Sequence, residues 1–166
     1  KDMASREDNA SLQEKTNSLR RIMGVSELLY SLPIPTISII NGPAAGAAFA
    51  IALSCDMRIA TDNAKFVTAF SKIGFSGDFG GSFFLTKIVG TAKARELYYL
   101  SEMINAEEAL KLGIVSNVIE KNTIDKYVEN MKLKFQNLPP IAIKYMKKNL
   151  NNAELGNLDL SLNDEA

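Results

Sequence analysis

The strongest constraint on the fold is a strand pattern that stops at a small-residue loop and passes directly into a helix pattern. Thr36–Ile40 is rich in β-branched residues, which predicts a short buried strand. Asn41-Gly42-Pro43 interrupts this run, and almost every residue of Ala44–Leu53 is small or helix-forming. The first backbone N–H groups of such a helix have no partner inside it, so the junction favours an anion or a developing oxyanion.

A glycine-flanked acidic turn lies further along the chain. Gly77-Asp78-Phe79-Gly80-Gly81 places one carboxylate in a shaped loop that begins at Ser71. An aspartate between glycines is common in solvated turns, and that interpretation of Asp78 stays open. The alternative is a carboxylate that moves a proton beside the oxyanion-binding junction.

The composition excludes several kinds of chemistry. The 166 residues have the size of one ordinary domain, with 46% hydrophobic and 23% charged residues. There is no histidine and only one cysteine, Cys55, which excludes histidine-based catalysis, histidine metal sites, intrachain disulfides and cysteine metal clusters. The 19 basic residues balance 19 acidic ones, so no nucleic-acid partner is indicated. Acid–base chemistry must come from carboxylates, Lys, Tyr or water.

One apolar segment, Ile34–Ala60, raises the question of a membrane span. Pro43 and the charged residues Asp56 and Arg58 interrupt it, and a buried strand, loop and helix explain the pattern better. No signal-peptide pattern is visible at Lys1. We therefore expect a cytoplasmic protein without membrane contact.

The remaining elements follow from hydrophobic spacing and from capping or breaking residues. Strands are predicted at Cys55–Ala60, Phe66-Val67, Met103-Ile104 and Ile114–Ile119. Helices are predicted from Leu12 to before Pro33, and at Gly46–Leu53, Ser82–Val89, Lys93–Leu100, Ala106–Leu112 capped by Asn105, Thr123–Gln136 and Pro139–Leu150. A strand directly after the Gly46–Leu53 helix gives the order of a βαβ unit, so the chain is assigned to the α/β class. Residues 1–150 form the expected core, which starts with a polar loop over 1–11. Residues 151–166 receive no element and are interpreted as the start of a C-terminal segment.

Five stretches together resemble the crotonase (enoyl-CoA hydratase/isomerase) superfamily. They are Ile37–Asp56, Phe66–Gly74, Asp78–Ser82, Gly90–Leu100 and Ala106–Val115. Each is weak alone, but their order and spacing are specific. Family members are longer at both ends, and the first three residues resemble what directly follows the family's first oxyanion residue. The resemblance therefore implies a partial crotonase-like β-β-α spiral (the ClpP/crotonase fold) without its N-terminal part and its C-terminal end.

The same resemblance implies an activity. Family members bind acyl-CoA thioesters, assemble as trimers or hexamers, and stabilise an enolate oxyanion with two backbone N–H groups. One donor falls on Ala47, directly after Gly46, and the other would lie before Lys1. In sites of this kind, each donor lowers the barrier by about 3 kcal/mol. The coenzyme A thioester is the substrate, and no further cofactor and no metal are expected.

The departures from the family pattern favour double-bond isomerisation over hydration. The two glutamates of hydratases fall on Ala50 and Phe70, and neither residue can move a proton. Asp78 matches the catalytic aspartate of several double-bond isomerases of the family. One carboxylate facing an apolar pocket suits this reaction, because desolvation raises its pKa. The residues expected to bind the substrate are Gly46, Phe70, Phe75, Phe79 and Gly80.

Three alternatives remain open beside the isomerase. The first is an enoyl-CoA hydratase or CoA-ester hydrolase that uses other residues or water. The second uses Asp78 as a nucleophile, as in the aryl-CoA dehalogenases, but that group's histidine is missing here. The third is a non-catalytic family member that binds CoA or a partner subunit, since both glutamates are replaced.

Several other residues receive structural interpretations. Cys55 is expected to be an inert core thiol, and Asp56 and Arg58 are expected to form an ion pair or polar contacts. Tyr98 and Tyr99 are assigned to the core or to a subunit interface. Three lysines of the last predicted helix are compatible with CoA phosphates but are assigned to a solvated helix face: Lys144, Lys147 and Lys148.

Overall fold

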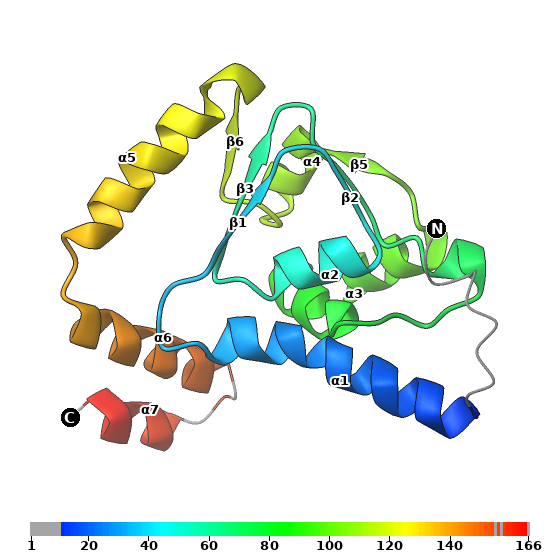
Figure 1. Ribbon diagram of the computed structural model, residues 1–166, viewed down its shortest axis with the longest axis horizontal. Coiled ribbons are helices and arrows are strands. Elements are labelled where there is room, and N and C mark those ends of the chain that lie inside the picture. Colours follow the sequence, from blue (N-terminus) through cyan, green and yellow to red (C-terminus); the bar gives the residue numbers. More distant parts are fainter. Residues whose placement is uncertain (1–10, 155, 157, 166) are drawn as a thin grey trace.

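The computed structural model describes residues 11–154, 156 and 158–165, which form helices around two small sheets (Figure 1). The strands are β1 (Ile37–Ile40), β2 (Pro43–Ala45), β3 (Met57–Thr61), β4 (Lys65–Val67), β5 (Ile104–Asn105) and β6 (Asn117–Ile119). The α-helices are α1 (Leu12–Ser31), α2 (Ala47–Leu53), α3 (Gly81–Leu100), α4 (Ala106–Lys111), α5 (Ile124–Gln136), α6 (Pro140–Ala153) and α7 (Leu158–Glu165). Two short 3₁₀ turns, η1 (Ser71–Ile73) and η2 (Lys121–Thr123), complete the described elements.

The described strands pair into two three-stranded sheets. One sheet has the order β1-β3-β6 and is entirely parallel, with Ile37 opposite Met57 and Ile59 opposite Asn117. The other has the order β2-β4-β5, in which β2 and β4 are parallel and β4 and β5 antiparallel. Because β2 and α2 connect β1 to its parallel neighbour β3, the predicted βαβ unit is confirmed.

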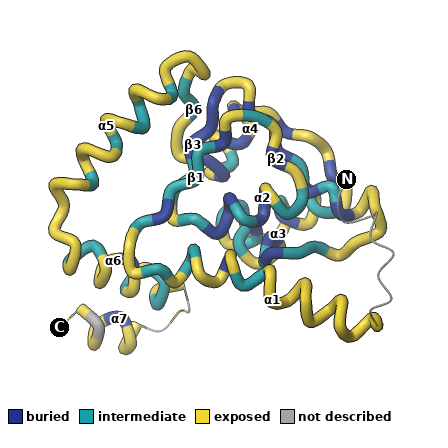
Figure 2. The backbone as a smooth tube through the Cα atoms, in the orientation of Figure 1, coloured by how far each residue is buried: buried dark blue, intermediate teal, exposed yellow. Residues whose placement is uncertain are grey.

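The core lies where α2, α3 and α4 pack against these strands. Its largest fully buried apolar side chains include Ile59, Phe66, Leu85 and Ile114. Figure 2 shows the buried positions concentrated in this region, whereas α5 and most of α1 are exposed. The buried core of the described residues therefore surrounds the strand–helix junction that the sequence singles out.

Most of the predicted elements are confirmed, including details of their ends. Asn105 caps α4 through a capping box, in which its side chain accepts from the Glu108 N–H and Glu108 accepts from the Asn105 N–H. The predicted break between the helices Ser82–Val89 and Lys93–Leu100 is a kink at Gly90, with φ 76° and ψ 164°, inside the single helix α3. Left-handed φ values of this kind favour glycine, so a strong kink at this point agrees with the sequence.

One strand and one α-helix were not predicted. The strand β2 was included in a loop and a helix, because proline and alanine carry no strand signal, and only its pairing with β4 makes it a strand. The helix α7 lies in residues 151–166, where no element was assigned, and α6 extends to Ala153 rather than ending at Leu150. The polar loop predicted over 1–11 lies outside the described residues except for Ser11, which caps α1.

The interpretation of Lys147 as a solvated lysine is wrong. Its side chain is only 7% exposed, and its ammonium group contacts the Asp56 carboxylate at 2.8 Å. It also donates to the backbone carbonyl oxygens of Leu29 and Ile34, each at 3.1 Å. Lys147 therefore joins α6 to the end of α1 and to the start of β3.

The Arg58 side chain makes its hydrogen bonds to backbone carbonyl groups. The Arg58 guanidinium donates to the carbonyl oxygens of Ile114 and Cys55, at 2.7 and 2.6 Å. Of the two alternatives for Asp56 and Arg58, the polar contacts are observed and a mutual ion pair is not, among the described residues. Burial lowers the pKa of Arg58, and the carbonyl oxygens around it satisfy the charged group.

None of the helices among the described residues combines the length and the apolar character needed to cross a membrane. Likewise, no group of three or more His, Cys, Asp or Glu residues in that part of the chain is arranged to hold a metal ion.

Candidate active site

The turn before α2 presents the backbone N–H group of Ala47. Gly46 has φ 52° and ψ −120°, a backbone conformation that residues other than glycine rarely adopt. Its own N–H donates to the Val67 carbonyl at 3.0 Å, and its carbonyl accepts from the Ala50 N–H at 2.9 Å. Ala47 is the first residue of α2, so the helix itself provides no acceptor for its N–H. Ala47 is also only half-buried.

The turn that carries Asp78 has an unusual backbone. Phe79 and Gly80 both have positive φ, 47° and 72°, and the Gly81 N–H closes the turn on the Asp78 carbonyl at 3.0 Å. Positive φ at a phenylalanine is strained, and strain of this kind concentrates at functional sites. The turn ends where α3 begins, so Asp78 lies just before the N-terminus of that helix.

The carboxylate of Asp78 is partly withdrawn from water. Asp78 is half-buried, and its Oδ1 atom is buried without a hydrogen-bond partner among the described residues. Burial raises the pKa of Asp78 above its usual range, because the charged form is poorly solvated. A buried acceptor without a partner is uncommon in folded proteins and calls for an explanation.

A close contact between α2 and α3 brings these two turns together. A Cβ atom at Gly81 would lie only 2.9 Å from the Cβ of Ala50, so the two helices touch at these positions. Ala47 lies one helical turn before Ala50, and Asp78 lies three residues before Gly81. The N–H donor and the carboxylate are therefore both within one turn of the same contact.

We expect Gly81→Ala to destabilise the full-length protein by about 1–3 kcal/mol, because the added methyl group overpacks the contact. It would lie 2.6 Å from the Tyr98 hydroxyl and 2.9 Å from the Ala50 side chain. The measurement is the free energy of unfolding from chemical denaturation.

Gly24→Ala provides a matched control for this substitution. Gly24 lies in α1 with no atom within 4 Å of its added Cβ, so the change should stabilise by up to about 1 kcal/mol. Equal changes in the free energy of unfolding for the two substitutions would contradict the close contact at Gly81.

The positions of the two expected hydratase glutamates are apolar and buried. Ala50 is 2% exposed and Phe70 is 5% exposed. The Phe70 ring stacks on the Tyr98 ring, with 6.0 Å between their centroids and an angle of 12° between their planes. Neither position offers a carboxylate, and the space around them is filled by aromatic rings.

A hydrogen-bond network holds the Phe70 segment against α3. The Thr68 hydroxyl donates to the Leu97 carbonyl at 2.8 Å and lies 2.9 Å from the Ser101 hydroxyl. The Ser71 hydroxyl also donates to that of Ser101, at 2.8 Å. These buried contacts fix the segment of Phe70 relative to the helix that carries Tyr98.

The predicted site residues are brought together only in part. Gly46 and Phe70 line the same filled space between α2, α3 and β4, and Gly80 is part of the Asp78 turn. Phe79 is buried at 5% exposure and Phe75 is 69% exposed, and neither lines this space. The Phe75 N–H donates to the Phe70 carbonyl at 3.0 Å, but its side chain is largely exposed, so its place in a substrate pocket stays a prediction.

Tyr98, which stacks on Phe70, was predicted to belong to the core or to a subunit interface, and no role at the site was assigned to it. Burial and the nearby charge of Asp78 raise the pKa of Tyr98 to about 12, so its hydroxyl stays protonated at neutral pH. No local pattern marks it, because it lies 20 residues after Asp78 and only the packing of α3 brings the two together.

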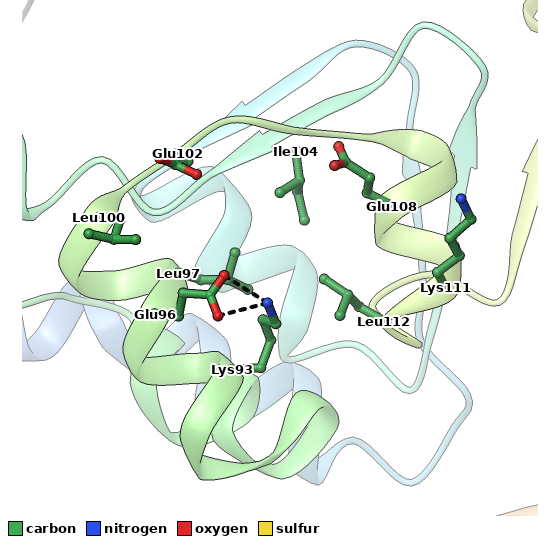
Figure 3. A pocket seen from close by; sticks show the side chains of 9 residues that line it. All are labelled: Lys93, Glu96, Leu97, Leu100, Glu102, Ile104, Glu108, Lys111 and Leu112. Carbon is green, nitrogen blue, oxygen red and sulfur yellow. Dashed lines mark hydrogen bonds and ion pairs between the residues drawn. The ribbon is translucent and has the colours of Figure 1, made fainter.

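Other polar groups near hollows have structural roles. A hollow of about 260 Å³ between α3, β5 and α4 is lined by five charged side chains (Figure 3): Lys93, Glu96, Glu102, Glu108 and Lys111. Lys93 pairs with Glu96 at 2.7 Å, and Glu108 belongs to the capping box of α4. Burial raises the pKa of Cys55 above its usual value, as expected for an inert thiol.

Comparison with solved structures defines the class of fold. An enoyl-CoA hydratase from Polaromonas sp. JS666 superposes with a TM-score of 0.87 at 30% sequence identity, covering 93% of this chain and 60% of that one. A Thermobifida fusca YX protein, solved in complex with acetoacetyl-CoA, superposes with a TM-score of 0.83 at 27% identity, covering 92% of this chain and 62% of that one. The fold is that of the crotonases.

The sequence comparison gives the family. Residues 1–162 match the family described as Enoyl-CoA hydratase/isomerase. A curated relative, the 1,2-epoxyphenylacetyl-CoA isomerase of Escherichia coli (strain K12), is 36% identical over 137 residues, which are 82% of this chain and 52% of the relative. The chain therefore belongs to the enoyl-CoA hydratase/isomerase family, as the resemblance implied. It spans about half the length of the curated relatives it matches.

Proposed function

We propose that the protein of which this chain is part shifts a double bond in an enoyl-CoA, with Asp78 as the base and the Ala47 N–H as one oxyanion donor. The observation that carries this proposal is the partly buried Asp78 carboxylate, whose Oδ1 has no hydrogen-bond partner among the described residues, in a chain whose positions 50 and 70 are apolar. The acyl-CoA substrate, the trimeric or hexameric assembly and the cytoplasmic location belong to the same proposal. An isomerase and several hydratases occur among the relatives, so family membership alone leaves the reaction open.

The proposed reaction needs one base and no added water. Asp78 removes a proton from C2 of a 3-enoyl thioester, and the electron pair of that C–H bond enters a dienolate whose negative charge rests on the thioester oxygen. The Ala47 N–H stabilises this oxygen. Asp78 then returns the proton to C4, the double bond forms between C2 and C3, and the carbonyl group is restored.

The raised pKa of Asp78 suits this double role. A base with a higher pKa takes a proton from carbon more readily, and its conjugate acid remains acidic enough to return it. The cause of the shift is the partial burial of the carboxylate, which leaves its charged form poorly solvated.

The test uses the full-length protein with 3-enoyl-CoA esters of increasing chain length in D2O, followed by NMR and mass spectrometry. Formation of 2-enoyl-CoA, with deuterium entering C2 or C4 over many turnovers, is the expected result. Formation of 3-hydroxyacyl-CoA as the main product would identify a hydratase instead. Release of free CoA would identify a hydrolase, and binding without any reaction would support a non-catalytic family member.

A further inference from the structure

We propose that the ring of Tyr98 keeps water out of the site and so commits the enzyme to moving a proton rather than adding water. This inference rests on the proposed function, since it concerns which of two reactions the same enolate undergoes. It gives Tyr98 the role of a specificity-determining residue, separate from the base and from the oxyanion donor.

The first support is the position of the ring. Tyr98 stacks on Phe70, with 6.0 Å between ring centroids, and its hydroxyl end reaches the start of α3. A Cβ atom at Gly77 would lie 3.4 Å from Tyr98 Cε1, and one at Gly81 would lie 2.6 Å from Tyr98 Oη. The two glycines next to the Asp78 turn thus leave the room that this side chain occupies.

The second support is the absence of free space between the two apolar positions. Ala50, Phe70 and Tyr98 line a gap that also touches Gly46 and Gly81. Within the described residues this gap holds no volume that a water molecule can enter. The structure therefore leaves no room for water between positions 50 and 70.

The third support is the state of Asp78. Its Oδ1 atom is buried, and no hydrogen bond from the described residues replaces the water that it has lost. The titratable group found to interact with it electrostatically is Tyr98, which is neutral at physiological pH. Asp78 is therefore desolvated without being paired, as expected when an uncharged side chain covers it.

Water exclusion has two chemical consequences. Hydration of a 2-enoyl thioester forms a C3–O bond with water and places a proton on C2, so it requires a water molecule beside C3. Proton return from Asp78 to C4 requires none, and a protonated Asp78 shielded from solvent keeps the proton that it removed. A dry site should therefore transfer the substrate's own proton from C2 to C4.

The experiment compares Tyr98→Ala with Tyr99→Ala and Tyr98→Phe in the full-length protein. Tyr99 follows Tyr98 in α3 but is 72% exposed, so it provides a matched control. The first measurement is the deuterium content of 2-enoyl-CoA after a single turnover in D2O. For the wild type and for Tyr99→Ala we expect roughly a tenth or less of the product to carry solvent deuterium, and for Tyr98→Ala at least about fivefold more.

Tyr98→Phe separates the ring from the hydroxyl. It keeps the ring, so its product should carry as little solvent deuterium as that of the wild type. If Tyr98→Phe resembles Tyr98→Ala, the hydroxyl rather than the covering ring is responsible, and the proposal is overturned. Equal labelling by Tyr98→Ala and Tyr99→Ala also overturns it. Should Tyr98→Ala fail to fold, Tyr98→Leu removes the planar ring while retaining an apolar side chain.

A second measurement does not need turnover. Carbon-13 NMR titration of the Asp78 carboxyl in the substrate-free protein should show its pKa falling towards the ordinary range in Tyr98→Ala, because water then reaches the carboxylate. The pKa should stay raised in Tyr99→Ala and Tyr98→Phe. If the wild type catalyses no double-bond migration, the proposed function fails, whereas this titration still decides whether Tyr98 shields Asp78. An unchanged Asp78 pKa in Tyr98→Ala would overturn the inference.

Discussion

Replacing Asp78 with asparagine in the full-length protein should lower the rate of double-bond migration by a factor of roughly 10² to 10⁴, the usual contribution of a general base. Asparagine has almost the same shape and fits the same turn, but it cannot accept the C2 proton. The Asp78 Oδ1 atom has no hydrogen-bond partner among the described residues, so the substitution breaks no contact that those residues show. We therefore expect binding of the CoA ester to survive, with the loss confined to kcat.

Asp125→Asn is the matched control for this prediction. Asp125 is exposed at the start of α5, a helix that lies away from the contact between α2 and α3 (Figure 1). Its substitution should leave the rate unchanged. Comparable rates for wild type and Asp78→Asn would move the chemistry to another residue.

The pH dependence offers an independent check of the same base. Asp78 must be ionised to accept a proton, so kcat/KM should fall as the pH is lowered through its pKa. Burial raises that pKa, which places the acid limb above the range of an ordinary aspartate. An acid limb at the ordinary aspartate value would contradict a desolvated base.

The second large effect concerns stability. Asp56→Asn should lower the free energy of unfolding by about 3 kcal/mol, because it leaves the ammonium group of Lys147 buried without a counter-charge. The Lys147 side chain is 7% exposed, and its other recorded acceptors are the neutral carbonyl oxygens of Leu29 and Ile34. Asparagine retains an oxygen that can accept from the Thr36 N–H, which now donates to Asp56 at 2.6 Å. The measured loss should therefore reflect the missing charge.

A second substitution tests this explanation. Adding Lys147→Met to Asp56→Asn removes the unpaired charge, so the double variant should be more stable than Asp56→Asn alone. Asp125→Asn, an exposed exchange of the same kind, should change stability by no more than about 0.5 kcal/mol. A double variant with the summed loss of both single variants would show that the two residues act independently.

The fold could be predicted from the sequence to the extent that local patterns specify it. The helix cap at Asn105, the break at Gly90 and the strand–loop–helix order of Thr36–Leu53 were all predicted from residues a few positions apart. Hydrogen bonds in helices and their caps join such near neighbours, so the amino-acid order carries the information directly. The strand β2 was not predicted, because its partner strand β4 lies 22 residues further along the chain.

The candidate site divides in the same way. Gly46, Ala47 and Asp78 stand in turns that are visible in the sequence, and the family resemblance supplied their expected chemistry. Nothing local distinguishes Tyr98 from Tyr99, yet one stacks on Phe70 and the other is 72% exposed. Which of two adjacent helical residues faces a neighbour depends on how the helix is rotated against it.

By itself, the sequence determined the α/β class, the helix predicted over Gly46–Leu53 and the carboxylate at position 78, while the family resemblance implied that both hydratase glutamates are replaced. Only the tertiary structure decided that Gly81 touches Ala50, that Tyr98 fills the space beside Phe70, and that Lys147 pairs with Asp56, 91 residues earlier. The physical reason is the range of the interactions. Helix caps and turns are formed within a few residues, whereas contacts between side chains distant in sequence exist only after the helices and sheets have packed into one core.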